Sequence, residues 1–352
     1  MSIVNIRKEV MKDLEKTVVK LLDKFLILPE KNWQPTDFLP NSQKNTFIDE
    51  VKAIQELSKD LEDEFWIVLV GDVITEEALP TYESWLMDLD GIKQTTDSPW
   101  LKWIRAWTAE ENRHGDVLNK YLYLSGRVNM REMEVSTQYL IRDGFDIGTA
   151  MDPYKNFVYT SFQELATYIS HNNVAKIAKD KGHTALAKMS KLIAGDEMRH
   201  HNAYTQFVKE IFVLDPSEMM LAYLHMMKHK IMMPAMYLRE SYETKGKAFD
   251  KFADCAQKLG VYTGYDYVNI IEELNKVWDL GQIKNLSGEA EKARDYLMKL
   301  PERMYKITDR IVIPDTKHQF KWFYTAYNYF GNTICFFFHH PTHYHGAINK
   351  HS

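Results

Sequence analysis

Long stretches of the chain repeat apolar residues three and four positions apart, which is the spacing of a helix with one buried face. The pattern opens with an amphipathic helix over about 6–25, followed by an irregular arm that holds Trp33 and several prolines. Eleven Pro and fifteen Gly are few for 352 residues, so long helices can persist. Further helices are expected over 46–59, 62–89 with an interruption near Pro80, 100–125, 130–143, 154–180, 184–213, 216–232, 245–259, 265–283 and 287–311.

Two of these predicted helices carry the same short motif. Glu-x-x-His occurs at Glu111 to His114 and again at Glu197 to His200. Residues three apart on a helix differ by about 60° around its axis, so the carboxylate and the imidazole can hold one ion together. A single copy is common on helix surfaces. The repetition therefore carries the prediction of a metal site.

A lone acid precedes each motif at a similar distance. Glu76 lies 35 residues before Glu111, and Glu164 lies 33 residues before Glu197. Each half of the core thus resembles a helical hairpin, and two hairpins predict a ferritin-like four-helix bundle with six ligands for two metal ions. Four carboxylates balance two divalent ions, which allows burial near neutrality. The fold class is therefore all-α, with the bundle inside a larger helical domain.

Neighbouring residues compete for some of these positions. In the first hairpin two further acids lie within a turn of the lone Glu, and spacing does not choose among the three. In the first motif only the second of two adjacent acids lies three residues before the histidine. In the second motif two adjacent histidines follow the acid, and the first is preferred because it copies the spacing of the other motif. The competing residues are Glu76, Glu77 and Asp72, then Glu110 and Glu111, then His200 and His201.

Composition narrows the class of protein further. A hydrophobic content of 45% is ample for a large core, and a net charge of −5 gives no sign of nucleic-acid binding. The two cysteines, Cys255 and Cys335, are far apart in sequence, which favours a reducing compartment. The longest apolar runs fall far short of the roughly 20 residues that span a bilayer. Without a recognisable signal or transit peptide, we expect a cytoplasmic protein with no membrane span.

Several longer stretches resemble one known family. They are Gly71 to Tyr82, Arg105 to Asp116 with Asn119 to Arg127, and Tyr159 to Glu164 with Ile169 to His171. All resemble the soluble acyl-acyl carrier protein desaturases, which are the stearoyl carrier-protein desaturases of plastids and their bacterial relatives. The resemblance is close over about 30–240 and looser over 240–320.

The resemblance implies a dimeric helical enzyme with a di-iron centre, which inserts a cis double bond into a fatty acyl chain on acyl carrier protein. A ferredoxin-like donor would supply two electrons. It also implies that Thr167 takes part in oxygen activation and that Trp33 and Asp196 form an electron route to the iron. Without the family, Trp33 would be interpreted as packing and Asp196 as a surface acid. The implied iron ligands are Glu76, Glu111, His114, Glu164, Glu197 and His200.

An acidic carrier protein needs a locally basic docking surface. Lys228 and Lys230 lie in the region where the family docks its carrier, although a solvated helix end would look the same. An apolar channel is needed to hold the acyl chain and exclude water. Candidates for its walls are Trp85, Leu86, Leu89, Phe157, Tyr159 and Phe162, although an aromatic at helical spacing is more often ordinary core.

The chain also departs from the family. Leu165 replaces an Arg common in relatives, and Trp85 is bulky for a channel wall. The segment from Phe323 onward, rich in aromatic residues and histidines, does not resemble the family and could bind stray metal. We therefore divide the chain into an N-terminal helix and arm (1–45), a di-iron domain (46–313) and a divergent tail (314–352). A di-iron hydroxylase or oxidase and a non-catalytic iron-binding protein are the alternative functions.

Overall fold

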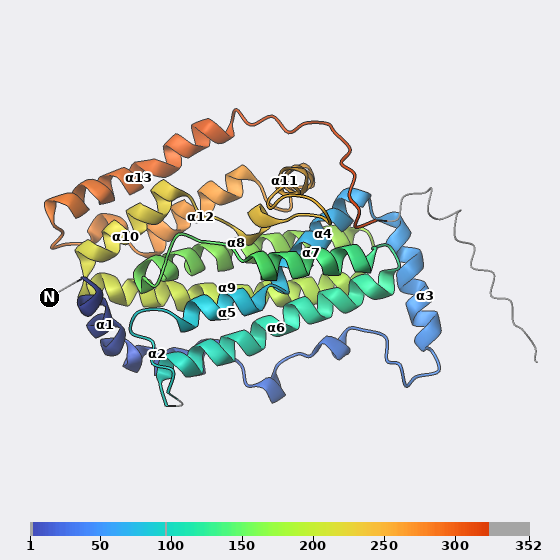
Figure 1. Cartoon of the computed structure of the whole chain (residues 1–352), viewed down its shortest axis with the longest axis horizontal. Helices are drawn as coiled ribbons and strands as arrows, with labels where there is room; N and C mark the ends of the chain where they lie inside the picture. Colours follow the sequence, from blue (N-terminus) through green and yellow to red (C-terminus); the bar gives the residue numbers. More distant parts are fainter. Residues whose placement is uncertain (1–2, 96, 324–352) are drawn as a thin grey trace, which may run out of the picture.

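The computed structural model describes residues 3–95 and 97–323, and this part of the chain is built from helices without a β-strand (Figure 1). One isolated bridge joins Val128 and Phe323. The α-helices are α1 (Ile3–Asp13), α2 (Glu15–Phe25), α3 (Phe47–Leu57), α4 (Asp63–Glu76), α5 (Leu79–Met87), α6 (Pro99–Ser125), α7 (Met130–Asp143), α8 (Pro153–Asp180), α9 (Thr184–Leu214), α10 (Pro216–His229), α11 (Phe249–Lys258), α12 (Gly264–Val277) and α13 (Gly288–Thr308).

Four of these helices, α4, α6, α8 and α9, form the centre of the molecule. The long helices α8 and α9 pack along each other, and α6 packs against both α4 and α9 (Figure 1). Helix α8 starts at Pro153, where the Asp152 side chain accepts a hydrogen bond from the Tyr154 amide at 3.0 Å and so caps the helix. The predicted all-α fold, with a four-helix bundle inside a larger helical body, is confirmed.

The remaining helices surround this bundle. Helices α10 to α13 cover one side, and α1 and α2 lie at one end, opposite α3 (Figure 1). Helix α11 comes very close to α4 because Gly71 has no side chain. A Cβ at that position would lie 2.2 Å from the Phe252 ring. The glycine therefore lets α11 form a wall directly against the bundle.

Some helix boundaries differ from the predictions. The expected helix over 6–25 is two helices, α1 and α2, separated by a turn at Leu14. Helix α10 ends at His229 instead of 232, because Lys230 adopts a φ of +61° and cannot continue it. Gly126, with a φ of +66°, ends α6 where the sequence placed the end.

Both predicted end segments contact the body. In the N-terminal arm, Trp33 makes an edge-to-face contact with Phe38 at 5.8 Å between ring centres, and the short 3-10 helix η2 (Pro35–Asp37) packs on α6. Near the C-terminal side, Trp322 is buried and its indole N–H donates to the Ser136 hydroxyl at 2.9 Å. The histidines after Phe323, which the sequence suggested could bind stray metal, lie outside the described residues. The three-part division of the chain stays a prediction.

Across 3–95 and 97–323, no helix is both long enough and apolar enough to cross a membrane.

Candidate metal centre

The structure brings the six predicted ligands together inside the bundle. Glu76 is the last residue of α4, whereas the other five lie within α6, α8 and α9. Glu76 is half-buried and the other five are buried. The hairpin arrangement inferred from the repeated spacing therefore places all six side chains in one region.

Oxygen and nitrogen atoms of these residues form two overlapping groups. Within each group, one atom from each residue lies within 4.8 Å of the others. Glu111 and Glu197 belong to both groups, which is the position of carboxylates that bridge two metal ions. Each group adds one further Glu and one His. The groups are Glu76, Glu111, His114 and Glu197, and Glu111, Glu164, Glu197 and His200.

Several atoms that face the centre of the site are buried without a hydrogen bond. Nδ1 of His114 lies 3.1 Å from Oε1 of Glu197, and Nδ1 of His200 lies 2.7 Å from Oε1 of Glu111. Buried polar atoms normally have partners, so an unpaired cluster needs an explanation. Carboxylate oxygen and imidazole nitrogen suit divalent transition metals, and the residues present therefore fit two metal ions. The unpaired atoms are Glu111 Oε1, His114 Nδ1, Glu164 Oε2, Glu197 Oε1 and His200 Nδ1.

The pKa shifts in the site also support binding of metal cations. Burial, with the charge of Glu111, raises the pKa of Glu164 well above its ordinary value. Burial lowers the pKa of His114, but Glu111 and the other surrounding carboxylates outweigh that effect and raise it well above its ordinary value. The protein groups alone therefore leave excess negative charge, which cations would neutralise.

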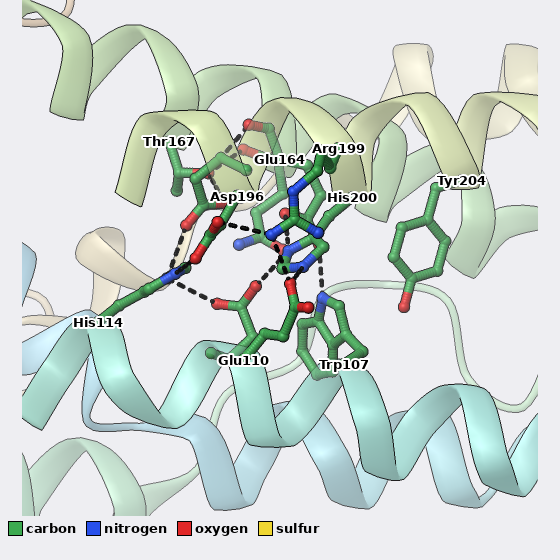
Figure 2. A network of polar contacts seen from close by, with 12 residues as sticks. Trp107, Glu110, His114, Glu164, Thr167, Asp196, Arg199, His200 and Tyr204 are labelled. Atoms are coloured by element: carbon green, nitrogen blue, oxygen red, sulfur yellow. Dashed lines mark hydrogen bonds and ion pairs between the residues drawn. The ribbon is translucent and has the colours of Figure 1, made fainter. Parts of the chain in front are cut away.

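Acids outside the cluster contact the two candidate ligand histidines. His114 Nε2 lies 3.3 Å from Asp196 Oδ2, and His200 Nε2 lies 3.0 Å from Glu110 Oε2 (Figure 2). Such contacts fix the ring and direct its other nitrogen toward the metal. Glu110, which competed with Glu111 as a ligand, thus has the same relation to His200 as Asp196 has to His114.

Two arginines connect the two Glu-x-x-His motifs. Arg113 contacts Asp196 at 3.1 Å, while Arg199 contacts both Glu110 at 2.8 Å and Asp196 at 2.6 Å. Burial disfavours the Asp196 carboxylate, but His114 and Arg199 hold its pKa well below the ordinary value. The sequence-based prediction included neither these arginines nor a role for Glu110. The signal was present, because both motifs read acid-Glu-x-Arg-His.

The N-terminal arm reaches the same network. The Trp33 indole N–H donates to Asp196 Oδ2 at 3.0 Å, and its ring lies parallel to the His114 ring, with 6.1 Å between centres. The Arg113 guanidinium lies 4.5 Å above the Trp33 ring. Trp33 and Asp196 therefore form a continuous series of contacts that ends at His114.

Three further side chains hold the ligand carboxylates. The Thr167 hydroxyl donates to Glu197 Oε2 at 2.6 Å, and the Trp107 indole donates to Glu164 Oε1 at 3.0 Å. His171 Nε2 lies 2.8 Å from Oε1 of Glu76. Thr167 was predicted here, whereas Trp107 and His171 were not. Both belong to stretches quoted for the family resemblance, but their spacing suggested no role.

The other competing residues make different contacts. Glu77 accepts a hydrogen bond from Asn119 at 2.5 Å, and His201 Nδ1 lies 2.8 Å from the Ser161 carbonyl oxygen. The side chain of Asp72 lines a cavity.

This cavity has a volume of about 490 Å³ and extends from the metal centre toward α11, α12 and α13. Glu76, Glu111 and Thr167 form part of its wall, so it reaches the candidate metal ligands directly. Its size falls in the range of about 300–1,000 Å³ that is usual for small-molecule sites. Much of its remaining wall is apolar and includes Val68, Leu79, Tyr82, Ile231, Phe252 and Ile311.

The residues predicted to line an acyl channel lie elsewhere. None of the six candidates lines this cavity, because most of them fill the core between α5, α6, α8 and α9. Trp85 is half-buried in an aromatic cluster behind Tyr82, with its ring centre 4.6 Å from Phe145 and 6.5 Å from Tyr159. The six are Trp85, Leu86, Leu89, Phe157, Tyr159 and Phe162. Their regular spacing reflected packing, which was the alternative for an aromatic at helical spacing.

Both predicted docking lysines are exposed at the end of α10. Lys228 Nζ lies 5.6 Å from the ring centre of Tyr296 on α13. Lys230 immediately precedes Ile231, the first residue of a cavity-lining segment. The basic side chains are thus next to the cavity in sequence.

The helical bundle, the repeated Glu-x-x-His motif and the two shared carboxylates define the ferritin-like class of helical proteins with a candidate two-metal centre. A family model described as fatty acid desaturase matches residues 6–324. The chain belongs to this fatty acid desaturase family.

Its relatives carry more specific names. It is 48% identical over 305 residues to stearoyl-[acyl-carrier-protein] 9-desaturase 1, chloroplastic, of Arabidopsis thaliana, covering 86% of this chain and 77% of that protein. The acyl-[acyl-carrier-protein] desaturase, chloroplastic, of Cucumis sativus is 47% identical over 307 residues, with 86% and 77% covered. These names place the relatives in the chloroplast, whereas the cytoplasmic location expected for this chain stays a prediction.

A solved structure titled as a putative acyl-ACP desaturase, DesA2 from Mycobacterium tuberculosis H37Rv, aligns over 78% of this chain and 96% of its own. The identity is 17% and the TM-score is 0.49, a match too distant to bear on function.

Proposed function

We propose that this chain is an O₂-dependent di-iron desaturase that introduces a cis double bond into a saturated fatty acyl chain carried on acyl carrier protein. One observation carries the proposal. Glu76 and Glu111 belong to the metal-binding groups and also form part of the wall of an apolar cavity. A methylene of a chain in that cavity would therefore lie beside the metals. The family and the names of the relatives support the same reaction.

The residues divide between two irons. Glu76 and His114 would hold one iron, Glu164 and His200 the other, and Glu111 and Glu197 would bridge them. Iron reacting with O₂ supplies an oxidant strong enough to remove hydrogen from an unactivated methylene, which no amino-acid side chain can do. Thiolate ligands would be oxidised in such a site, and none is present among the six.

The cavity wall provides orientation and exclusion of water. An extended acyl chain between α4, α8 and α11 would have few rotational states, so one carbon pair would stay beside the metal ligands. Val68, Leu79 and Phe252 replace water around the chain, which protects the reaction from side products. Thr167 is the polar exception, because its hydroxyl faces the cavity and donates to Glu197.

Electrons would enter the metal centre from the side of the bundle where the N-terminal arm packs. Trp33, Asp196 and His114 are in successive contact, and Trp33 belongs to the half-buried arm near the surface. A ferredoxin-type donor that binds over this arm would deliver two electrons for each double bond, and the acyl chain supplies the other two that reduce O₂ to water. This arrangement separates the donor from the carrier protein.

The carrier protein would dock where the cavity meets the surface. Lys228 and Lys230 are exposed beside the cavity-lining segment, and Arg303 on α13 lies 5.5 Å from the same Tyr296 ring that Lys228 contacts. Positive charge there complements an acidic carrier. We also propose a homodimer, as the family resemblance implies.

The test is a complete reaction. Protein loaded anaerobically with iron is mixed with stearoyl- or palmitoyl-acyl carrier protein, reductant, ferredoxin and O₂, and the released acids are analysed by mass spectrometry. An acid that has lost two hydrogens at one position supports desaturation. A product that has gained oxygen indicates a hydroxylase, and unchanged acids at every chain length would contradict the proposal.

A further inference from the structure

His171 is a buried histidine that the proposed reaction does not use. It lies on α8 and only 1% of its surface is exposed. Its Nε2 is 2.8 Å from Oε1 of Glu76, whereas its Nδ1 makes no hydrogen bond within the described chain. A carboxylate oxygen only accepts, so the geometry places the proton on Nε2.

A comparable contact exists at the other end of the metal centre. The Trp107 indole N–H, from α6, donates to Oε1 of Glu164 at 3.0 Å. In both contacts a ring N–H from the other hairpin holds one carboxylate oxygen. The second oxygen then faces a ligand histidine, with 3.7 Å between Glu76 Oε2 and His114 Nδ1 and 3.5 Å between Glu164 Oε2 and His200 Nδ1.

Glu76 needs this support more than the other ligands. It is the final residue of α4, where the helix gives way to a turn before α5. It borders the cavity, as Glu111 does, but the other five candidate ligands lie inside long helices, whereas Glu76 does not. A side chain at a helix end beside open space has more rotameric freedom, which must be lost when it binds a metal.

We propose that His171 is a positioning residue for the metal centre, whose Nε2–H fixes Oε1 of Glu76 so that Oε2 stays directed at the ion held by His114. This inference rests on the proposed function only in assuming that the chain binds two metals. Groups that orient metal ligands typically change affinity by about 10- to 100-fold when removed. Without this contact, the side-chain freedom that Glu76 loses on binding a metal would weaken one of the two metal sites.

The test uses cobalt(II), whose visible absorption reports its ligands, and needs no catalysis. Metal-free protein is titrated with cobalt(II) as wild type, His171→Leu and His171→Gln. Leu removes the donor, whereas the Gln amide can place an N–H near the original Nε2. We expect His171→Leu to weaken one site by about 10- to 100-fold, with an altered absorption band, and His171→Gln to restore most of the affinity.

Two further variants guard the interpretation. His183→Leu is the matched control, because His183 is also 1% exposed but contacts the Leu57 carbonyl and the Tyr121 hydroxyl instead of a ligand. We expect it to leave both cobalt sites unchanged. His171→Asn is too short to reach Glu76 and replaces the Leu variant if that one does not fold, with the same loss expected.

The outcomes separate the two proposals. Wild-type affinity at both sites in His171→Leu or His171→Asn would overturn the positioning role. So would a His171→Gln protein that is folded yet binds cobalt as weakly as His171→Leu, because the donor would then be irrelevant. If wild-type protein binds no pair of ions at all, the proposed di-iron function fails instead.

Discussion

Arg199 of the second Glu-x-x-His motif binds Glu110 of the first, with 2.8 Å between Nη2 and Oε2. The reverse contact also exists, because Arg113 of the first motif binds Asp196 of the second at 3.1 Å. The two motifs therefore support each other symmetrically: each arginine holds an acid of the other motif, and that acid orients the histidine of the arginine's own motif. This arrangement gives the candidate metal centre two similar halves. The halves differ in the residues that contact them from outside the motifs.

One half of the centre is connected to Trp33. We predict that Trp33→Phe slows electron transfer from a ferredoxin-type donor without lowering iron content, because the ring stays beside His114 but loses its N–H bond to Asp196. The rate of donor oxidation under single-turnover conditions measures this. A small chemical reductant that diffuses to the site provides the comparison and should act equally on both proteins. Equal rates with the protein donor would exclude the route through Trp33.

Trp85 contacts Tyr82, which lines the cavity, with 5.8 Å between the ring centres, but Trp85 does not itself line the cavity. We predict that Trp85→Ala extends the cavity, so that longer acyl chains are accepted and the double bond moves relative to the thioester. The stability loss should be smaller than the about 3–5 kcal/mol of a fully buried tryptophan, because Trp85 is half-buried. Product analysis by mass spectrometry, with Trp85→Phe as the conservative control, measures the shift. An unchanged product from a folded Trp85→Ala protein would contradict this prediction.

The docking surface should respond to charge. We predict that Lys228→Glu with Lys230→Glu raises KM for the acyl carrier protein and leaves kcat unchanged, because the change repels an acidic partner before the reaction. The increase in KM should shrink as salt is added. Lys52→Glu on α3, an exposed lysine at the other end of the molecule, is the control (Figure 1). An identical KM in the double variant and the control would show that the carrier protein docks elsewhere on the surface.

Asp72 gives a pH-dependent prediction for the metal-free protein. Burial raises the pKa of Asp72 to about 7, partly offset by the charge of His171 and the Ser170 hydroxyl, while Glu76 adds to the rise. An unfolded Asp titrates near about 3.9, so between roughly pH 4 and 7 the folded state binds more protons than the unfolded state. The contribution of neutral Asp72 to stability is therefore complete below about pH 4 and is lost as the pH rises through about 7.

Asp72→Asn should remove this dependence. We expect wild type to lose stability from pH 5 to 8 by up to about 3 kcal/mol relative to the variant, because about two pH units at roughly 1.4 kcal/mol each separate pH 5 from the folded pKa, and less where water in the cavity solvates the carboxylate. Urea unfolding at the two pH values measures the difference. If both proteins change in parallel, Asp72 is already ionised at pH 5 and the assignment fails.

The sequence predicted the elements with a strong period most reliably. The central helices and the two Glu-x-x-His pairs followed from local rules, because i,i+3 spacing fixes which side chains share a helix face. The choice of Glu76 over Glu77 and Asp72 came only from the family resemblance. Glu110 was missed although both motifs carry an acid directly before the Glu, whereas Trp107 and His171 were missed because their contacts join helices far apart in sequence. Nothing local distinguishes such a residue from ordinary core.

The residues predicted to line the channel lie elsewhere for a related reason. Tyr159 and Phe162 have the spacing of a buried helix face, and spacing cannot tell whether that face meets a neighbouring helix or an empty cavity. The cavity wall instead includes Phe252 on α11, which reaches the bundle because Gly71 leaves room. That close approach involves two segments about 180 residues apart, so it is a property of the tertiary packing.

The central claim is that these six side chains bind two irons, and Glu164→Gln tests it most directly. Glu164 has the strongly raised pKa of an acid buried without a cation, so the neutral Gln should fold at least as well while it loses one ligand. The matched control is Glu77→Gln, next to Glu76 but hydrogen-bonded to Asn119. We predict two irons per chain in wild type and in the control, and fewer in Glu164→Gln, measured by elemental analysis after anaerobic loading and desalting. Two irons in a folded Glu164→Gln protein would contradict the account.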